Sequence, residues 1–326
     1  MTRFHNAMGL ACAGLIASIA TQVDAQQAYP SRPIRFVTPF PPGGSTDPMA
    51  RFVAAKLTER LGQQVIVENR PGANTVIGTD VVVRATPDGH TMLYVGAAFY
   101  GITALIPNLP FDTQRDLTAV GTLSKSRSVL VVHPSVPVQS LQELVALAKA
   151  KPGQINFGSS GHGTTAHFNG ELLRLATNID IRHIPYKGSG PLSTDLLAGR
   201  IDMAFQVPIT VVAFIAGGKL RPLVHTGETR LAALSQVPTF SEVGMPGFGV
   251  NSISGIAVPA KTPRRVVERL STELAAIIGA PETAEFMVKH GAEPFINNPD
   301  QANVVFRDEI ARYVKVIKQT GIAYKP

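Results

Sequence analysis

The sequence predicts an α/β protein made of two similar lobes, and three observations support this prediction. Short apolar runs typical of strands alternate with amphipathic helical stretches along most of the chain. Two segments, which start near residues 34 and 155, share one layout: a strand, a small glycine-rich loop and a helix. With 326 residues, the chain is also long enough to bury two hydrophobic cores.

The first 25 residues have the pattern of an export signal. Arg3 supplies a positive charge, residues 7–20 are mostly apolar, and residues 23–25 form a small-residue cleavage pattern. This apolar run is too short for a permanent transmembrane helix. We therefore expect cleavage after residue 25 and a periplasmic protein. A lipid anchor on Cys12 is the alternative, but Gly9 occupies the position where an apolar residue is expected.

Composition and charge argue against several functions. The net charge is +7, but lysine and arginine are scattered and are not interleaved with aromatic residues, so no nucleic-acid groove is expected. A mild attraction for small anions is the safer inference. The one cysteine lies within the predicted signal, so the mature chain would lack disulfides. His162 and His167 are not at the four-residue spacing of paired helical ligands, and we expect no metal and no cofactor.

The first glycine loop joins a predicted strand at residues 34–37 to a predicted helix. Prolines and glycines from residue 39 to residue 44 end the strand, because proline cannot donate to a β-ladder and glycine permits tight turns. Asp47 precedes Pro48, as an N-cap precedes a proline at the first helical position. Free amides of such a loop and helix N-terminus favour an anion.

The rest of the first lobe continues the alternation. Strands are predicted at residues 64–68 and 91–95, with a helix at 75–84 between them. Residues 96–100 (Gly-Ala-Ala-Phe-Tyr) are predicted to form a loop at the C-terminal end of a strand, where open parallel sheets bind ligands. A strong strand is predicted at residues 128–133.

The second lobe contains the second glycine loop, Ser159–Thr164. Its predicted strands span residues 155–158, 181–184, 201–205 and 221–224. Its predicted helices span residues 141–151, 165–177 and 191–198. After an extended segment at 251–258, helices are predicted at 263–278, 281–290 and 299–319.

These elements predict the domain organisation. We place the two crossings between the lobes near residues 123–131 and 251–258. The first lobe would then comprise residues 26–126 and 252–326, and the second lobe residues 127–251, after a signal peptide at 1–25. Each lobe is expected to be a mostly parallel sheet flanked by helices, with the ligand in the cleft between the lobes.

Motifs along the whole mature chain resemble the extracytoplasmic substrate-binding proteins of tripartite tricarboxylate transporters, the Bug family. These motifs are residues 29–34, 42–47, 67–73, 87–89, 157–161, 185–188 and 238–239, together with the helix that carries His167. The resemblance implies a periplasmic-binding-protein-like fold that closes on a small organic carboxylate and delivers it to membrane permease subunits. It implies binding without catalysis, and we expect a monomer.

The glycine loops and the resemblance together predict ligand-binding residues on both lobes. From the first lobe these are Phe40, Gly43, Gly44, Ser45, Thr46, Asp47, Ala73, Asn74, Ala97 and Phe99. From the second lobe they are Ser159, Gly161, Thr164, His167, Tyr186 and Gln206. Hydroxyls and amides donate to a carboxylate without a full countercharge. Phe99 and Tyr100 either stack on an aromatic acid or only pack within the protein.

Three questions stay open from the sequence. An exported hydrolase is one alternative, with Ser159 and His167 as nucleophile and base, although Gly-Ser-Ser-Gly at 158–161 is not a nucleophile elbow. A ligand sensor for a signalling partner is another, since capture and closure would look identical. The acid itself is also open, because Asn74 and the two residues after it replace glycines common in the family.

Overall fold

The structure is a computed structural model that describes residues 29–44, 46–289 and 291–322. The expected signal peptide, Ser45 and His290 lie outside these described residues. Cleavage after residue 25 therefore stays a prediction.

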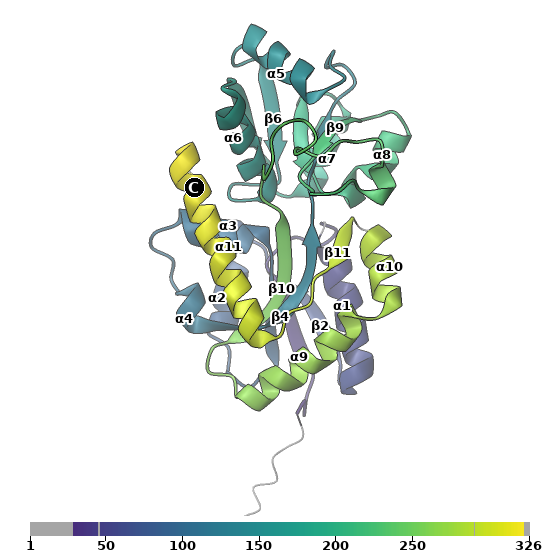
Figure 1. Cartoon of the computed structure of the whole chain (residues 1–326). Helices are drawn as coiled ribbons and strands as arrows, with labels where there is room; N and C mark the ends of the chain where they lie inside the picture. Colours follow the sequence, from purple (N-terminus) through teal and green to yellow (C-terminus); the bar gives the residue numbers. More distant parts are fainter. Residues whose placement is uncertain (1–28, 45, 290, 323–326) are drawn as a thin grey trace, which may run out of the picture.

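Two sheets, each flanked by helices, form the two lobes that are stacked in Figure 1. The six-stranded sheet has the order β11-β4-β10-β3-β1-β2, and the five-stranded sheet the order β7-β6-β8-β5-β9. Strands of the first sheet are β1 (Ile34–Thr38), β2 (Val65–Asn69), β3 (Thr91–Val95), β4 (Leu117–Ser126), β10 (Ser252–Pro259) and β11 (Ala292–Pro294). Strands of the second are β5 (Val129–Val132), β6 (Ile155–Ser159), β7 (Ile181–Pro185), β8 (Met203–Gln206) and β9 (Arg221–His225).

Both sheets are mixed, so the expectation of mostly parallel sheets is wrong in this detail. β1 is parallel to β2 and β3, but β10 is antiparallel to both β3 and β4. In the second sheet, β6 is parallel to β7 and β8, whereas β5 is antiparallel to β8 and β9. The physical reason is the double crossing: β4 leaves the first lobe, β10 returns to it, and neighbouring strands of opposite direction pair antiparallel.

The two crossing strands connect the lobes. β10 pairs with β4 from Ser252, opposite Ser126, to Pro259, opposite Leu117. Figure 1 shows these two strands running side by side toward the second lobe. Only residues 127 and 128 separate β4 from β5 of the other sheet. The lobe boundaries that we assign, 126/127 and 251/252, fall at this connection.

Helices cover the faces of both sheets (Figure 1). Those that follow strands of the first lobe are α1 (Asp47–Leu61), η1 (Ala73–Thr75), α2 (Val76–Val83), α3 (Ala97–Leu105), α4 (Thr113–Asp116), α9 (Arg264–Ile278), α10 (Pro281–Lys289) and α11 (Pro299–Thr320). Those of the second lobe are α5 (Leu141–Ala150), α6 (Thr165–Thr177), α7 (Ser189–Leu197), η2 (Pro208–Thr210), α8 (Val212–Ala216) and η3 (Ala232–Leu234). None of the helices in the described ranges is long and apolar enough to span a bilayer.

Two local expectations are wrong. Residues 97–100 are not a loop, because α3 begins at Ala97, directly after β3 and an extended Gly96. Phe99 and Tyr100 are 3% and 0% exposed, since α3 is buried under α11, where Tyr100 contacts the rings of Phe306 and Tyr313. Both side chains thus pack within the protein.

The other error concerns the start of α1. Asp47 is the first helical residue and Thr46 is the N-cap, so the Asp47 side chain does not cap the helix.

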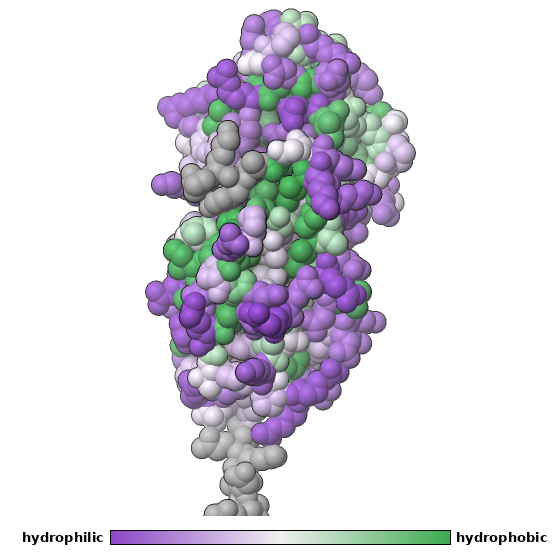
Figure 2. Space-filling model, turned by 90° about the vertical axis from the view of Figure 1, so that its left-hand side faces the viewer, coloured by the Kyte–Doolittle hydropathy of each residue, from purple (hydrophilic) through white to green (hydrophobic). Residues whose placement is uncertain are grey.

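The C-terminal helix α11 contacts both lobes. It packs on β4 and α3 of the first lobe and extends to α6 of the second. There the rings of Tyr313 and Phe168 meet edge to face at 4.6 Å, a contact of about 0.5–1.5 kcal/mol beyond area burial. Arg174 also donates to the backbone carbonyl of Thr320. In Figure 2, hydrophobic residues gather at the waist of this face, and hydrophilic residues cover much of the outer parts.

Candidate functional site

A cavity of about 860 Å³ lies between the lobes and is lined by residues of both. The first lobe contributes residues 39–44, 46, 71–75, 94, 96–98, 252 and 254. The second contributes residues 128, 160–162, 164–166, 185–192 and 205–207. This volume lies within the range of small-molecule sites.

Four helices begin at this cavity. The N-cap residues of α1, α3, α6 and α7, which are Thr46, Gly96, Thr164 and Gly188, all line it. Among the described residues, no side chain caps α1, α3 or α7. The Asp47 amide already donates to the Gly44 carbonyl and the Phe99 amide to the Gly96 carbonyl, and Pro48 and Pro191 have no N–H, so only the other first-turn amides of these helices can bond a ligand or water. Each helix N-terminus carries a partial positive charge. Two such termini from each lobe give the cavity a potential that favours an anion.

The charged side chains around the cavity agree with this potential. Of the described lining residues, Lys187 alone carries a formal charge at neutral pH if the histidines are neutral, and none is Asp or Glu. An organic anion would therefore meet no carboxylate on the cavity wall. The positive potential comes from peptide dipoles and one lysine, and the described lining has no arginine. The cavity should therefore attract an organic anion moderately.

Two buried donors on the cavity wall have no partner among the described residues. The Gln206 side chain is on a residue that is 4% exposed, and its Nε2 has no acceptor. The Thr210 hydroxyl is shared between Gln206 Oε1 at 3.2 Å and the Val207 carbonyl at 2.8 Å. The Thr75 hydroxyl is also buried without a partner. An unsatisfied buried polar group costs about 1–3 kcal/mol, so a ligand acceptor at these atoms would be stabilising.

The segment Ala73–Thr75 has a strained backbone. Its three residues have φ values of +42°, +55° and +87°, which non-glycine residues rarely adopt and a β-branched threonine least of all. Such strain costs about 1–3 kcal/mol per residue and is retained mainly at functional sites. The Asn74 side chain donates to the backbone carbonyl of His162, in the second lobe. The segment therefore bridges the two lobes at the cavity.

The structure brings most of the predicted site residues to this cavity. Those that line it are Phe40, Gly43, Gly44, Thr46, Ala73, Asn74, Ala97, Gly161, Thr164, Tyr186 and Gln206. Asp47, Phe99, Ser159 and His167 are not among the lining residues, and Ser45 lies outside the described residues. For every one of these predicted residues, lining or not, the assignment as a ligand contact stays a prediction.

Asp47 supports the first glycine loop from behind. Its carboxylate accepts from the Gly43 amide at 3.2 Å, from Arg51 at 2.9 Å and from Asn69 at 3.2 Å. Burial raises the pKa of Asp47, but these hydrogen bonds outweigh burial, so its pKa is lowered. With its oxygens thus occupied, Asp47 holds the first glycine loop in position.

Ser159 and His167 do not form a nucleophile–base pair. Ser159 is fully buried, and its hydroxyl contacts His183 Nε2 at 2.7 Å and donates to the Gly161 carbonyl at 3.0 Å. His167 Nδ1 instead accepts from the Gly163 amide at 3.2 Å. Burial, and to a smaller extent the neighbouring histidine rings, lowers the pKa of both His167 and His183 to about 3. Both rings are therefore neutral at neutral pH.

Aromatic rings form an apolar part of the wall. Phe40 packs edge to face on Tyr94 with centroids 6.4 Å apart. The Tyr186 hydroxyl donates to Asp195 at 2.8 Å, so its ring remains for the cavity. Burial and the Asp195 hydrogen bond raise the Tyr186 pKa to about 12. The wall can thus contact the carbon skeleton of an organic acid.

Sequence reasoning missed several lining residues. Tyr94, Ser252 and Ser254 line the cavity from the first lobe, and Ser128 and Lys187 from the second. The serines lie on or beside the crossing strands, and these strands had been placed by pattern alone. Polar residues in an otherwise apolar crossing segment were a signal that could have identified them.

The fold and the cavity define a class: a two-lobed solute-binding protein with its ligand site between the lobes. The chain belongs to the tripartite tricarboxylate transporter family of receptors, since residues 49–322 match the family described as "Tripartite tricarboxylate transporter family receptor". This confirms the resemblance stated from the motifs.

Relatives and solved structures agree with the family. The chain is 37% identical to Protein BugT of Bordetella pertussis over 328 residues, which cover 100% of this chain and 99% of BugT. A solved structure of R. palustris Rpa4515 with adipate has 33% identity and a TM-score of 0.86, and covers 90% of this chain and 99% of that one. MatC of Rhodopseudomonas palustris with bound malate has 27% identity and a TM-score of 0.80, over 89% and 100% of the chains.

Proposed function

We propose that this receptor captures a small organic carboxylate in the periplasm and delivers it to the permease subunits of a tripartite tricarboxylate transporter. One observation carries the proposal: four helix N-termini, two from each lobe, meet at a cavity without a described acidic lining residue. Two similar proteins, solved with adipate and with malate, support the ligand class.

A dicarboxylate fits this arrangement best. Each lobe offers a pair of helix N-termini, so each could hold one carboxylate of an aliphatic diacid, with the chain of the diacid against Phe40 and Tyr186. Charge-assisted hydrogen bonds contribute about 1.5–3 kcal/mol each. After the costs of association and closure, a few of them correspond to a Kd near 1 μM, or about −8 kcal/mol.

We infer binding without chemical conversion. The Ser159 hydroxyl is buried, is engaged by His183 and Gly161, and is not among the described lining residues, so it offers no exposed nucleophile. Release of the unchanged acid to a permease is the function that such a site supports.

The test is a thermal shift experiment with the chain from residue 26 onward. The panel contains adipate, malate, other aliphatic and aromatic acids, and adipamide as an uncharged match for adipate. At least one acid should raise the melting temperature in a concentration-dependent manner, and adipamide should not. Mass spectrometry should recover the acid unaltered. Flat melting temperatures across the panel would contradict carboxylate capture, and a converted product would contradict the inference of a non-enzyme.

A further inference from the structure

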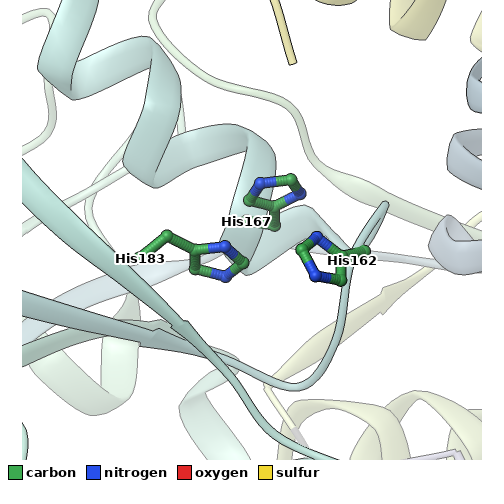
Figure 3. A group of neighbouring side chains, drawn as sticks. All are labelled: His162, His167 and His183. Carbon is green, nitrogen blue, oxygen red and sulfur yellow. The ribbon is translucent and has the colours of Figure 1, made fainter. Parts of the chain in front are cut away.

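Three histidines from three elements meet behind the second glycine loop (Figure 3). His162 lies in that loop, His167 in the first turn of α6, and His183 in the middle of β7. The rings of His167 and His183 are stacked at 4.1 Å, and His162 is edge-on to both at 5.3 Å. One nitrogen of each ring lies within 4.8 Å of the others.

We propose that His162, His167 and His183 bind one divalent transition-metal ion of the zinc or nickel class, beside the carboxylate cavity. Three imidazoles without a thiolate suit Zn²⁺, Ni²⁺, Co²⁺ and Cu²⁺, whereas Mg²⁺ and Ca²⁺ prefer oxygen ligands. Three histidine ligands leave one position of a tetrahedral ion for water. This metal site does not depend on carboxylate capture, the proposed function.

The geometry needs a local adjustment of the three rings. Zinc–nitrogen bonds of about 2.0–2.1 Å place tetrahedral ligand nitrogens about 3.4 Å apart, so nitrogens that are up to 4.8 Å apart must approach by up to about 1.4 Å. The stacked rings of His167 and His183, whose planes differ by 16°, must also tilt so that their in-plane lone pairs converge on the ion. His162 is the ligand that can move, because it is flanked by Gly161 and Gly163, with φ values of +137° and +73°. His167 and His183 stand on a helix and a strand and keep the site in place.

Hydrogen bonds already orient the two fixed rings. The Ser159 hydroxyl lies 3.0 Å from the Gly161 carbonyl and 2.7 Å from His183 Nε2. When Ser159 donates to Gly161, His183 Nε2–H donates to Ser159, and this tautomer leaves the Nδ1 lone pair for a metal ion. Such outer-shell partners fix the tautomer of metal-binding histidines. At His167, metal binding would displace the hydrogen bond from the Gly163 amide at 3.2 Å, which is long and therefore weak.

The site is coupled to the cavity through one residue. His162 lines the cavity, and its backbone carbonyl accepts the Asn74 side chain of the first lobe. A bound ion would therefore hold the second glycine loop to α6 and β7. Metal binding should stabilise the folded chain by RT ln(1 + M/Kd), where M is the free ion concentration, so the stabilisation grows with the logarithm of that concentration.

The test uses the chain from residue 26 onward, freed of any affinity tag and treated with a chelator. Calorimetric titration with Zn²⁺ and Ni²⁺ should give one ion per chain, and Co²⁺ should develop the visible absorption of a four-coordinate site. His162→Gln and His183→Gln should each weaken binding by at least about tenfold, the effect that loss of even an outer-shell partner produces. His133→Gln is the matched control, because His133 lies outside the triad and bonds Ser135; it should bind as the unaltered chain does.

Three results would overturn the proposal: no saturable binding, unchanged affinity in both triad variants, or an equal loss in His133→Gln. Circular dichroism separates lost ligands from lost fold. If His183→Gln does not fold, His162→Gln decides alone, because His162 is a partly exposed loop residue whose replacement leaves the core intact.

Discussion

Single side chains prepare the cavity for an acceptor that the protein itself does not supply. Gln206 Nε2 and the Thr75 hydroxyl are buried on the cavity wall without a partner among the described residues. Asp47 does the opposite: its oxygens are occupied, and it fixes the glycine loop through Gly43. Unsatisfied donors favour binding, whereas a satisfied carboxylate favours stability.

Gln206→Leu should weaken binding of the best carboxylate of the panel by about tenfold or more, because one charge-assisted hydrogen bond of about 1.5–3 kcal/mol is lost. The unfolding free energy should stay equal or rise, since an unsatisfied buried amide is removed. Titration calorimetry and urea unfolding measure both quantities. Gln139→Leu, at an exposed position outside the cavity, is the control; unchanged affinity in Gln206→Leu would remove Gln206 from the site.

Asp47→Asn should lower the free energy of unfolding at pH 7 by about 1–3 kcal/mol, because a charge-assisted hydrogen bond with Arg51 is lost. The folded-state pKa of Asp47 is lowered, so its stabilisation is present above the unfolded pKa of about 3.9 and disappears as the pH falls toward the folded pKa. The difference between variant and unaltered chain should therefore shrink as the pH falls below the unfolded pKa of about 3.9.

The control for this experiment is Asp300→Asn. Asp300 pairs with Arg264 on the surface, where ion pairs contribute about 0–1 kcal/mol. Denaturant unfolding at several pH values compares the two variants. An Asp47→Asn deficit that is independent of pH would show that the charge of Asp47 is not what stabilises the loop.

Helices and loops decide the geometry of the cavity at the next scale. The backbones of the two lobes lie very close where α3 meets the second glycine loop: a Cβ added to Gly101 would lie 1.9 Å from the Gly163 carbonyl oxygen. Both α3 and α6 begin at the cavity, so this glycine contact sets how near their N-termini can come. Because this contact is between backbone atoms, no flexible side chain can move aside to make room for an added methyl group.

Gly101→Ala should therefore force the two elements apart. We expect a loss of about 1–3 kcal/mol in unfolding free energy, as for overpacked sites, together with weaker carboxylate binding. Gly190→Ala is the matched control for stability, because it lies in α7 with no atom within 4 Å of the added Cβ. That variant should be neutral or slightly stabilised by its helix propensity. Equal stability of both variants would contradict the close approach.

At the scale of the whole molecule, two lobes with their own sheets share one ligand site. The crossing strands β4 and β10 and the helix α11 connect the lobes, and the cavity lies between them. A ligand held by helix N-termini of both lobes would act as an additional connection. The free energy of ligand binding then adds to the free energy of unfolding of both lobes.

Hydrogen exchange should show that a bound ligand stabilises both lobes, in the segments where helices begin at the cavity. Saturation with the best acid should slow exchange in residues 40–49 and 96–99 of the first lobe and in residues 160–167 and 187–191 of the second. The helix α5, which is distant from the lining residues, is the internal control and should be unaffected. Protection in only one lobe would contradict a ligand shared between them.

Much of the fold could be predicted from local patterns. Residues 165–177 form a helix with the predicted bounds, and β3 occupies residues 91–95 as expected, because the period of apolar residues and their capping signals are local. The start of α3 was missed since its apolar sequence carries no capping side chain: Gly96 precedes it. Packing of α3 against other parts of the protein, and not a local sequence signal, stabilises that helix.

The sequence by itself determined the α/β class, the two glycine loops, the helices that follow them and the family to which the chain belongs. Tertiary structure alone decided the mixed direction of the sheets, the burial of Phe99 and the meeting of His162 and His167 with His183. The reason is the range of the interactions: hydrogen bonding and side-chain period act over a few residues. Contacts between residues far apart in the chain form only when packed elements bring them together.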